Sequence, residues 1–119
     1  MSNINIGARE AVITSFARTP IGKAYRGAFN DTGAPALAGA AIAAAVERAG
    51  IDGAEVDDCI MGCAMPQGST GLNVGRSSAL AGGLPVTVSG MTIDRQCSSG
   101  MMAIATAAKQ IVADGMTTV

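Results

Sequence analysis

The sequence has 119 residues, enough for one domain, and its 14% of charged residues, net charge of -1 and lack of a basic cluster argue against nucleic acid as a partner. It has no run of about 18 apolar residues and no leader-like opening, so neither a membrane span nor a targeting segment is expected. Three cysteines without a secretory signal indicate a reducing compartment, and we expect a cytoplasmic protein.

Short apolar runs alternate with alanine-rich segments along the chain. Three short apolar runs are predicted as strands: AVITSFA (11–17), with β-branched residues and expected to be buried, CIMGCAM (59–65) and VTVSGMTID (86–94). Three segments with end signals are predicted as helices: 36–50, closed by Gly50; 72–83, capped by Asn73; and 97–114, closed by Gly115. The last residues, MTTV (116–119), are predicted to begin a fourth strand. This alternation predicts an α/β fold with a mostly parallel sheet.

The composition indicates a piece of a larger assembly. Hydrophobic residues make up 49% of the chain, only 3% is aromatic, and there are 16 glycines. Many alanines and glycines predict elements that pack backbone against backbone. A mean hydropathy of +0.37 leaves little polar surface for a compact body of this size. A strand that begins at the last residues also suggests a truncated protein.

The predicted helix 97–114 is apolar on nearly every side. Met101, Ile104, Ala108 and Ile111 follow one another at helical spacing and form one apolar stripe. The other sides carry further alanines and methionines, with few polar interruptions. A helix of this kind is predicted to be buried nearly all round.

Cys97 stands at the front of that helix, where a cysteine is either a small core residue or a nucleophile. Backbone N–H groups at a helix start favour the thiolate, and the small side chains of residues 98–100 leave room for a substrate atom. The strand-to-helix turn is mechanically similar to the elbow that presents the serine of α/β-hydrolases. On the residues alone, the buried structural cysteine is the favoured interpretation.

Three segments change that balance: ARTPIGK (17–23), GLNVGRSSALAGGLP (71–85) and MTIDRQCSSGMMAI (91–104). In this order they resemble the amino-terminal part of thiolases, the acetyl-CoA acetyltransferases and 3-ketoacyl-CoA thiolases of fatty acid metabolism. The resemblance covers essentially the whole chain. It implies part of the N-terminal half of a five-layer αβαβα architecture, in which the helix after Cys97 is a central, buried one.

The resemblance also implies an activity. Cys97 matches the cysteine that forms the acyl-enzyme during thiolytic cleavage of 3-ketoacyl-CoA or Claisen condensation of acetyl-CoA, and its backbone N–H would help hold the substrate oxygen. Coenzyme A thioesters would be the substrates, with no cofactor and no metal. Homodimers or homotetramers are expected, with residues 71–83 facing the dimer partner.

Two departures from the family pattern limit this expectation. The chain has no histidine, whereas thiolases need one to activate the nucleophile and another to bind the substrate oxygen. The second catalytic cysteine of thiolases lies in a Gly-rich carboxy-terminal motif, and neither Cys59 nor Cys63 has that setting. Residues 1–119 therefore read as the first part of a thiolase N-terminal domain, without the rest of that domain, the loop domain or the C-terminal domain.

This piece alone is predicted to be inactive. Two alternatives stay open: a ketoacyl-synthase-like condensing enzyme, against which RTPIGK argues, and a non-catalytic fragment that acts only as an interaction or oligomerisation module. Sequence beyond Val119 would discriminate between them.

Several other polar residues are given structural roles. Asp94, where many thiolases carry Asn, is predicted to bond backbone at its turn rather than to oppose the thiolate. Ser98 and Ser99 are predicted to cap the helix. Cys59 and Cys63 would lie roughly 13 Å apart on a strand, too far to share a metal. Three basic residues are predicted to anchor the first loop rather than to bind a CoA phosphate: Arg18, Lys23 and Arg26.

Overall fold

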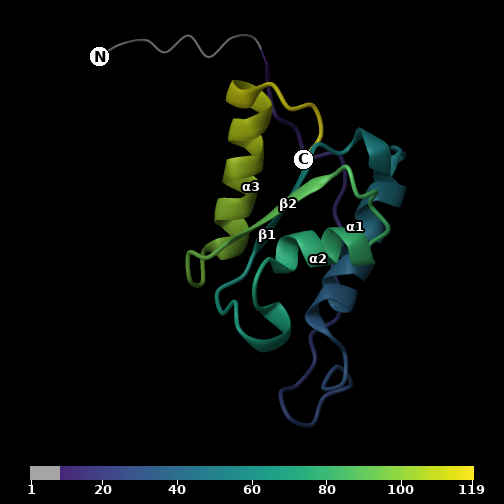
Figure 1. The fold of residues 1–119 in the computed structure, drawn as a ribbon, viewed down its shortest axis with the longest axis vertical. Coiled ribbons are helices and arrows are strands. Elements are labelled where there is room, and N and C mark those ends of the chain that lie inside the picture. The colour runs from purple at the N-terminus through teal and green to yellow at the C-terminus, as the bar shows by residue number, and fades with distance from the viewer. Residues whose placement is uncertain (1–8) are drawn as a thin grey trace.

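The computed structural model describes residues 9–119 as alternating helices and parallel strands. The main elements are α1 (Ala34–Ala49), β1 (Asp58–Gly62), α2 (Val74–Ala81), β2 (Ser89–Ile93) and α3 (Ser99–Lys109). Short helical turns cover Gly53–Glu55 and Gly68–Thr70, and a π-helical turn, Gln110–Asp114, continues α3. The α/β class with a parallel sheet is confirmed (Figure 1).

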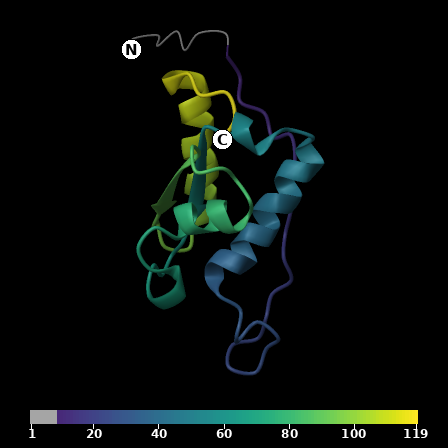
Figure 2. The same ribbon diagram turned by 45° about the vertical axis from the view of Figure 1, so that its right-hand side comes forward.

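The two strands lie between helices. β1 and β2 pair in parallel, with Asp58 opposite Ser89 and Gly62 opposite Ile93. α3 contacts β1 from one side, while α2 contacts both strands and also packs on α1. The two views show α3 on one face of the strand pair, and α2 with α1 on the other (Figures 1 and 2).

The ends of the helices follow the signals in the sequence. Gly50 has φ 68 in the left-handed region, and its N–H donates to the carbonyl of Glu47. The Asn73 side chain accepts a 3.2 Å hydrogen bond from the Arg76 N–H at the start of α2. Gly115 has φ 85 and closes the turn after α3. These three end signals are confirmed.

The core is small and is built where α1, α2 and the strands meet. Its buried apolar residues are Ala79, Leu84 and Val88, with side chains from α1, β1 and the turn before β1 packed against them. Glycine allows the close approach that the composition predicts. A Cβ on Gly39 of α1 would lie 2.8 Å from the carbonyl carbon of Ala81, so the two helix backbones nearly touch. No helix among residues 9–119 is long and apolar enough to cross a membrane.

The predicted first strand, 11–17, is wrong. The segment is extended but belongs to no ladder among residues 9–119. It is tied instead to α1, because the Ser15 hydroxyl donates to the Ala45 carbonyl at 2.6 Å and the Arg48 guanidinium donates to the Phe16 carbonyl at 2.7 Å. Three large apolar side chains of this stretch are mostly exposed: Val12, Ile13 and Phe16.

The predicted fourth strand, 116–119, is not formed either. One backbone bond joins it to the start of β1, from the Asp57 N–H to the Thr118 carbonyl at 2.9 Å. The Asp57 carboxylate accepts from the N–H of Thr117 at 2.7 Å, from the N–H of Thr118 and from the Thr117 hydroxyl. The Thr117 N–H, more than the other two donors, holds the pKa of Asp57 below its ordinary value. A carboxylate therefore replaces a strand partner here.

The expectation that α3 is buried nearly all round is also corrected. Met101 is 75% exposed and Ile104 is 61% exposed, whereas Ala103 faces inward and is buried. The reason is that, among the described residues, the strands cover only one side of this helix. On that side the buried Gln110 donates from Nε2 to the buried Asp58 carboxylate at 3.0 Å.

Candidate active site

Cys97 lies in the turn between the end of β2 and the start of α3, and its side chain is exposed. The helix begins at Ser99, so Cys97 precedes it by two residues instead of opening it, as the sequence predicted. The backbone explains the shift, because Gln96 has φ 51, in the left-handed region that non-glycine residues rarely adopt. The chain reverses at Gln96, and Cys97 is the first residue after the reversal.

Asp94 holds this reversal from the strand side. Its Oδ1 accepts a 2.9 Å hydrogen bond from the Gln96 N–H and a long one, 3.5 Å, from the Gln96 side chain. The prediction that Asp94 bonds backbone at the turn is confirmed. A carboxylate that accepts the N–H two residues ahead is an Asx turn, which stabilises unusual backbone angles locally.

Ser99 holds the reversal from the helix side. Its hydroxyl accepts from the Arg95 N–H at 2.8 Å and donates to the Gln96 carbonyl at 2.6 Å. The Ser99 side chain is only 3% exposed, so neither bond competes with water. Ser98 makes no side-chain capping bond. The capping prediction is therefore wrong for Ser98, and Ser99 ties the turn rather than the helix.

Gly62 allows β1 to press against the first turn of α3. A Cβ at this position would lie 2.4 Å from both the Gly100 nitrogen and the Ser99 carbonyl carbon. Beyond Gly62 the Cys63 N–H donates to the Ile93 carbonyl at 2.9 Å, which extends the strand pairing to the base of the turn. By contrast, a Cβ on Gly100 would meet nothing within 4 Å. The turn is thus supported from beneath and open on its outer side.

The other two cysteines differ from Cys97 in their surroundings. Cys59 and Cys63 are half-buried. Burial, with a smaller effect from the neighbouring Asp58, raises the pKa of the Cys59 thiol. No group of three metal-binding side chains occurs within residues 9–119. Cys97 is the exposed thiol of the three.

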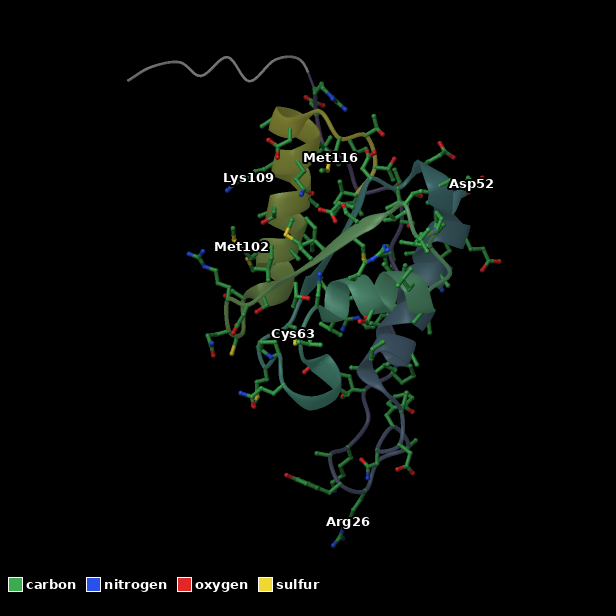
Figure 3. All side chains as sticks on the ribbon, in the orientation of Figure 1. Arg26, Asp52, Cys63, Met102, Lys109 and Met116 are labelled. Carbon is green, nitrogen blue, oxygen red and sulfur yellow. The ribbon has the colours of Figure 1, made fainter. Side chains whose placement is uncertain are left out.

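The basic residues of the first loop do not have the anchoring role that the sequence favoured. All three are exposed, and none hydrogen-bonds or ion-pairs through its side chain with another residue in the described part of the chain: Arg18, Lys23 and Arg26. Figure 3 shows Arg26 at the tip of a loop that projects beyond α1, with Cys63 near the end of β1.

A hollow among the described residues lies away from the Cys97 turn. It has a volume of about 590 Å³ and is lined by the extended stretch 11–16 and by residues of α1, β1 and α3. No residue of the turn 94–100 lines it. Cys97 is instead open to solvent, which allows a large reactant to reach its sulfur.

Sequence reasoning proposed Cys97 as the candidate nucleophile and predicted the turn contact of Asp94, but it missed three features of the site. These are the left-handed Gln96, the double hydrogen bond of Ser99 and the contact of Gly62. A glycine inside the apolar run CIMGCAM was the available signal for the last of them, since strand glycines often mark close backbone approach.

The chain is similar in sequence to a known protein family and to individual members of it. Residues 11–119 match the family model described as thiolase, N-terminal domain. The chain is 42% identical over 104 residues to a 3-ketoacyl-CoA thiolase of Bacillus subtilis, covering 87% of this chain and 27% of that protein. It is 40% identical over 111 residues to a 3-ketoacyl-CoA thiolase of Saccharophagus degradans, covering 92% of this chain and 28% of the relative.

A solved structure agrees with these matches. The crystal structure of the Bacillus anthracis acetyl-CoA acetyltransferase superposes with a TM-score of 0.80 at 44% identity, over 89% of this chain and 26% of that one. The chain thus spans about a quarter of the length of the relatives it matches.

Proposed function

This chain belongs to the thiolase family, and we propose that it is the nucleophile-bearing amino-terminal segment of an acyl-CoA acyltransferase. Its relatives are acyltransferases that carry the names 3-ketoacyl-CoA thiolase and acetyl-CoA acetyltransferase. One observation assigns the proposed nucleophile to a specific residue. Cys97 is an exposed thiol on a turn that is held by hydrogen bonds on both sides.

In the proposed reaction the Cys97 thiolate adds to the carbonyl carbon of an acyl-CoA thioester. The new C–S bond forms the acyl-enzyme, the C–S bond to coenzyme A breaks, and coenzyme A leaves with the proton that a base removed from Cys97. With a 3-ketoacyl-CoA, the thiolate adds to the ketone carbon, the adjacent C–C bond breaks, and acetyl-CoA leaves as a carbanion that takes up a proton.

The second step frees Cys97. In the degradative direction the thiol of coenzyme A attacks the acyl-enzyme, and in the synthetic direction the carbanion of acetyl-CoA does so. In both, the bond between the acyl carbon and the Cys97 sulfur breaks. The backbone N–H of Cys97 is proposed to stabilise the oxyanion in the first step.

The groups that move protons lie outside this sequence in our proposal. The 119 residues contain no histidine. Cys59 is a poor substitute for the second catalytic cysteine, because burial raises its pKa and so disfavours its thiolate. We therefore expect the 119 residues by themselves to give no turnover and to need the remaining parts of a thiolase for activity.

Assembly as a homodimer or homotetramer is part of the same proposal. Leu72 at the start of the segment 71–83 is fully exposed, and Leu80 in α2 is 43% exposed. Exposed apolar side chains of this size favour contact with another protein surface. A cytoplasmic location is proposed from the three free cysteines, which persist in reducing compartments.

The test is acyl-enzyme formation in a completed protein. The chain is fused to the carboxy-terminal remainder of the Bacillus anthracis acetyl-CoA acetyltransferase, incubated with acetyl-CoA and examined by intact mass and peptide mapping. We expect one acetyl group on Cys97, removed by added coenzyme A. Cys97→Ser should abolish the adduct, and the matched control Cys63→Ser should retain it.

The outcomes separate the candidate functions. A folded fusion with no adduct, or with the adduct on another cysteine, contradicts the nucleophile assignment and favours the non-catalytic interaction module. The 119-residue chain is tested in parallel, and an adduct that turns over on this chain alone would contradict the need for further residues.

A further inference from the structure

We propose that Ser99 is a positioning residue for Cys97, whose buried hydroxyl sets the direction in which the thiol is presented. This inference rests on the proposed function, because it concerns the reactivity of the same cysteine. It assigns to Ser99 a role in the reaction without contact to the substrate.

The hydrogen bonds of Ser99 close the turn on itself. Its hydroxyl accepts from the Arg95 N–H at 2.8 Å and donates to the Gln96 carbonyl at 2.6 Å, so it bonds both ends of the residue pair Arg95–Gln96 that precedes Cys97. Backbone bonds run the same way, from the Ser98 N–H to the Arg95 carbonyl and from the Ser99 N–H to the Gln96 carbonyl, each at 3.1 Å. Cys97 and Ser98 are the two residues enclosed by these hydrogen bonds.

The hydrogen bonds of Ser99 matter because Gln96 is held in an unfavourable conformation. Its φ of 51 is costly for a residue with a side chain and persists only where its surroundings require it. The Asp94 carboxylate supplies one restraint through the Gln96 N–H. Alongside the longer 3.1 Å bond from the Ser99 N–H to the Gln96 carbonyl, the Ser99 hydroxyl supplies a second side-chain restraint on that carbonyl. Without it, Gln96 can relax, and the Cα–Cβ bond of Cys97 turns with the backbone.

The position of Ser99 excludes direct participation. Its side chain is 3% exposed, whereas Cys97 is exposed. Gly62 of β1 is packed against the Ser99 main chain from below, since a Cβ there would lie 2.4 Å from the Ser99 carbonyl carbon. Ser99 is thus part of the floor on which the turn rests, and its hydroxyl is already committed to two backbone partners.

The first experiment measures the alkylation rates of the three cysteines by iodoacetamide in the 119-residue chain, residue by residue, using mass spectrometry. Ser99→Ala is expected to slow the reaction of Cys97 by at least about threefold, because the turn that presents the exposed thiol loses one of its hydrogen-bond restraints. The rates of Cys59 and Cys63 should stay unchanged and serve as internal monitors of folding. Ser99→Thr, which keeps the hydroxyl, should restore the Cys97 rate.

Ser98→Ala is the matched control. Ser98 is an exposed serine next to Cys97 with no side-chain capping bond, and its removal should leave the Cys97 rate within about twofold, within the usual range for surface substitutions. In the fusion protein described above, Ser99→Ala should lower kcat for acetyl transfer about tenfold and leave KM unchanged, since misorientation affects the reacting group and not substrate binding.

Three results would overturn the proposal. An unchanged Cys97 rate in Ser99→Ala means that the hydroxyl does not orient the thiol. Faster alkylation of Cys59 and Cys63 together with Cys97 means that Ser99 has only a general folding role. An equal effect of Ser98→Ala means that the buried hydrogen bonds are not the cause. Absence of an acyl adduct in the unmodified fusion would contradict the proposed function, while the alkylation rates would still decide the role of Ser99.

Discussion

Replacing Gly62 by alanine tests the contact on which the candidate site rests. The added Cβ would lie 2.4 Å from the Gly100 nitrogen, 2.4 Å from the Ser99 carbonyl carbon and 2.5 Å from the Ser99 oxygen. Non-bonded heavy atoms favour separations of about 3.5–4.0 Å. All three obstacles are backbone atoms, so no side-chain rotation relieves the clash, and β1 and α3 must move apart by about 1 Å.

The expected cost is a loss of about 2–3 kcal/mol in the free energy of unfolding. Overpacking of a close contact costs about 1–3 kcal/mol, and a backbone obstacle places Gly62→Ala at the upper end of that range. The change also lowers the entropy of the unfolded chain, which offsets about 0.5–1 kcal/mol. The backbone of Gly62 is not in the left-handed region, so the alanine itself adds no conformational strain.

The assay is urea unfolding followed by far-UV circular dichroism, with the slope m compared between variants. Gly100→Ala is the matched control, because its Cβ would meet nothing within 4 Å; we expect a gain of up to about 1 kcal/mol from helix propensity. If Gly62→Ala unfolds within about 0.5 kcal/mol of the parent chain, the close approach of β1 to α3 is wrong, and the support of the Cys97 turn with it.

Three further predictions address a helix cap and two ionisable groups. Asn73→Ala should lower the free energy of unfolding by about 1–2 kcal/mol in the same urea assay, because it removes the cap of α2 and a 2.7 Å bond to the Gly90 carbonyl. Asn73→Asp keeps the cap acceptor and should lose less stability, so equal losses in the two variants would contradict the capping role. Burial raises the pKa of Cys59 above the 9.0 of an ordinary thiol, so the Cys59 thiol ionises first in the unfolded chain and stability should fall as pH rises above about 9. The fall should be smaller in Cys59→Ala, and identical pH profiles of the variant and the parent chain would refute the effect of burial. The pKa of Asp57 is lowered mainly by the Thr117 N–H, so the stabilising effect of the Asp57 carboxylate is present above pH 3.8 and is lost as pH falls through the lower folded-state pKa. Asp57→Asn should weaken this acid dependence of the urea midpoint, and an unaltered dependence would count against the contact between Asp57 and Thr117.

The helices could be predicted because their signals are local. Alanine-rich runs favour helix residue by residue, and the residues at their ends act on the nearest backbone groups. Gly50, Asn73 and Gly115 therefore marked the correct ends without knowledge of any partner. The error at the start of α3 has a specific cause. The left-handed turn at Gln96 is unusual for a residue with a side chain, and no local preference predicts it.

The outer strands could not be predicted in this way. A strand exists only if another strand accepts its backbone hydrogen bonds, and that partner is distant in sequence. The runs 59–65 and 86–94 contribute β1 and β2, which pair with each other, although both strands are shorter than the apolar runs. Residues 11–17 also contain β-branched side chains, yet their described bonds go to α1 through Ser15 and Phe16.

For the candidate site, the sequence alone determined the family, the nucleophile candidate and the role of Asp94, because each depends on a short motif or on a contact between near neighbours. Only the tertiary structure decided how Cys97 is presented. Gly62 lies 35 residues before Cys97 in the chain, and only the parallel pairing of β1 with β2 brings it beneath Ser99. Close packing between distant segments arises when the chain folds, and no local pattern of residues specifies it.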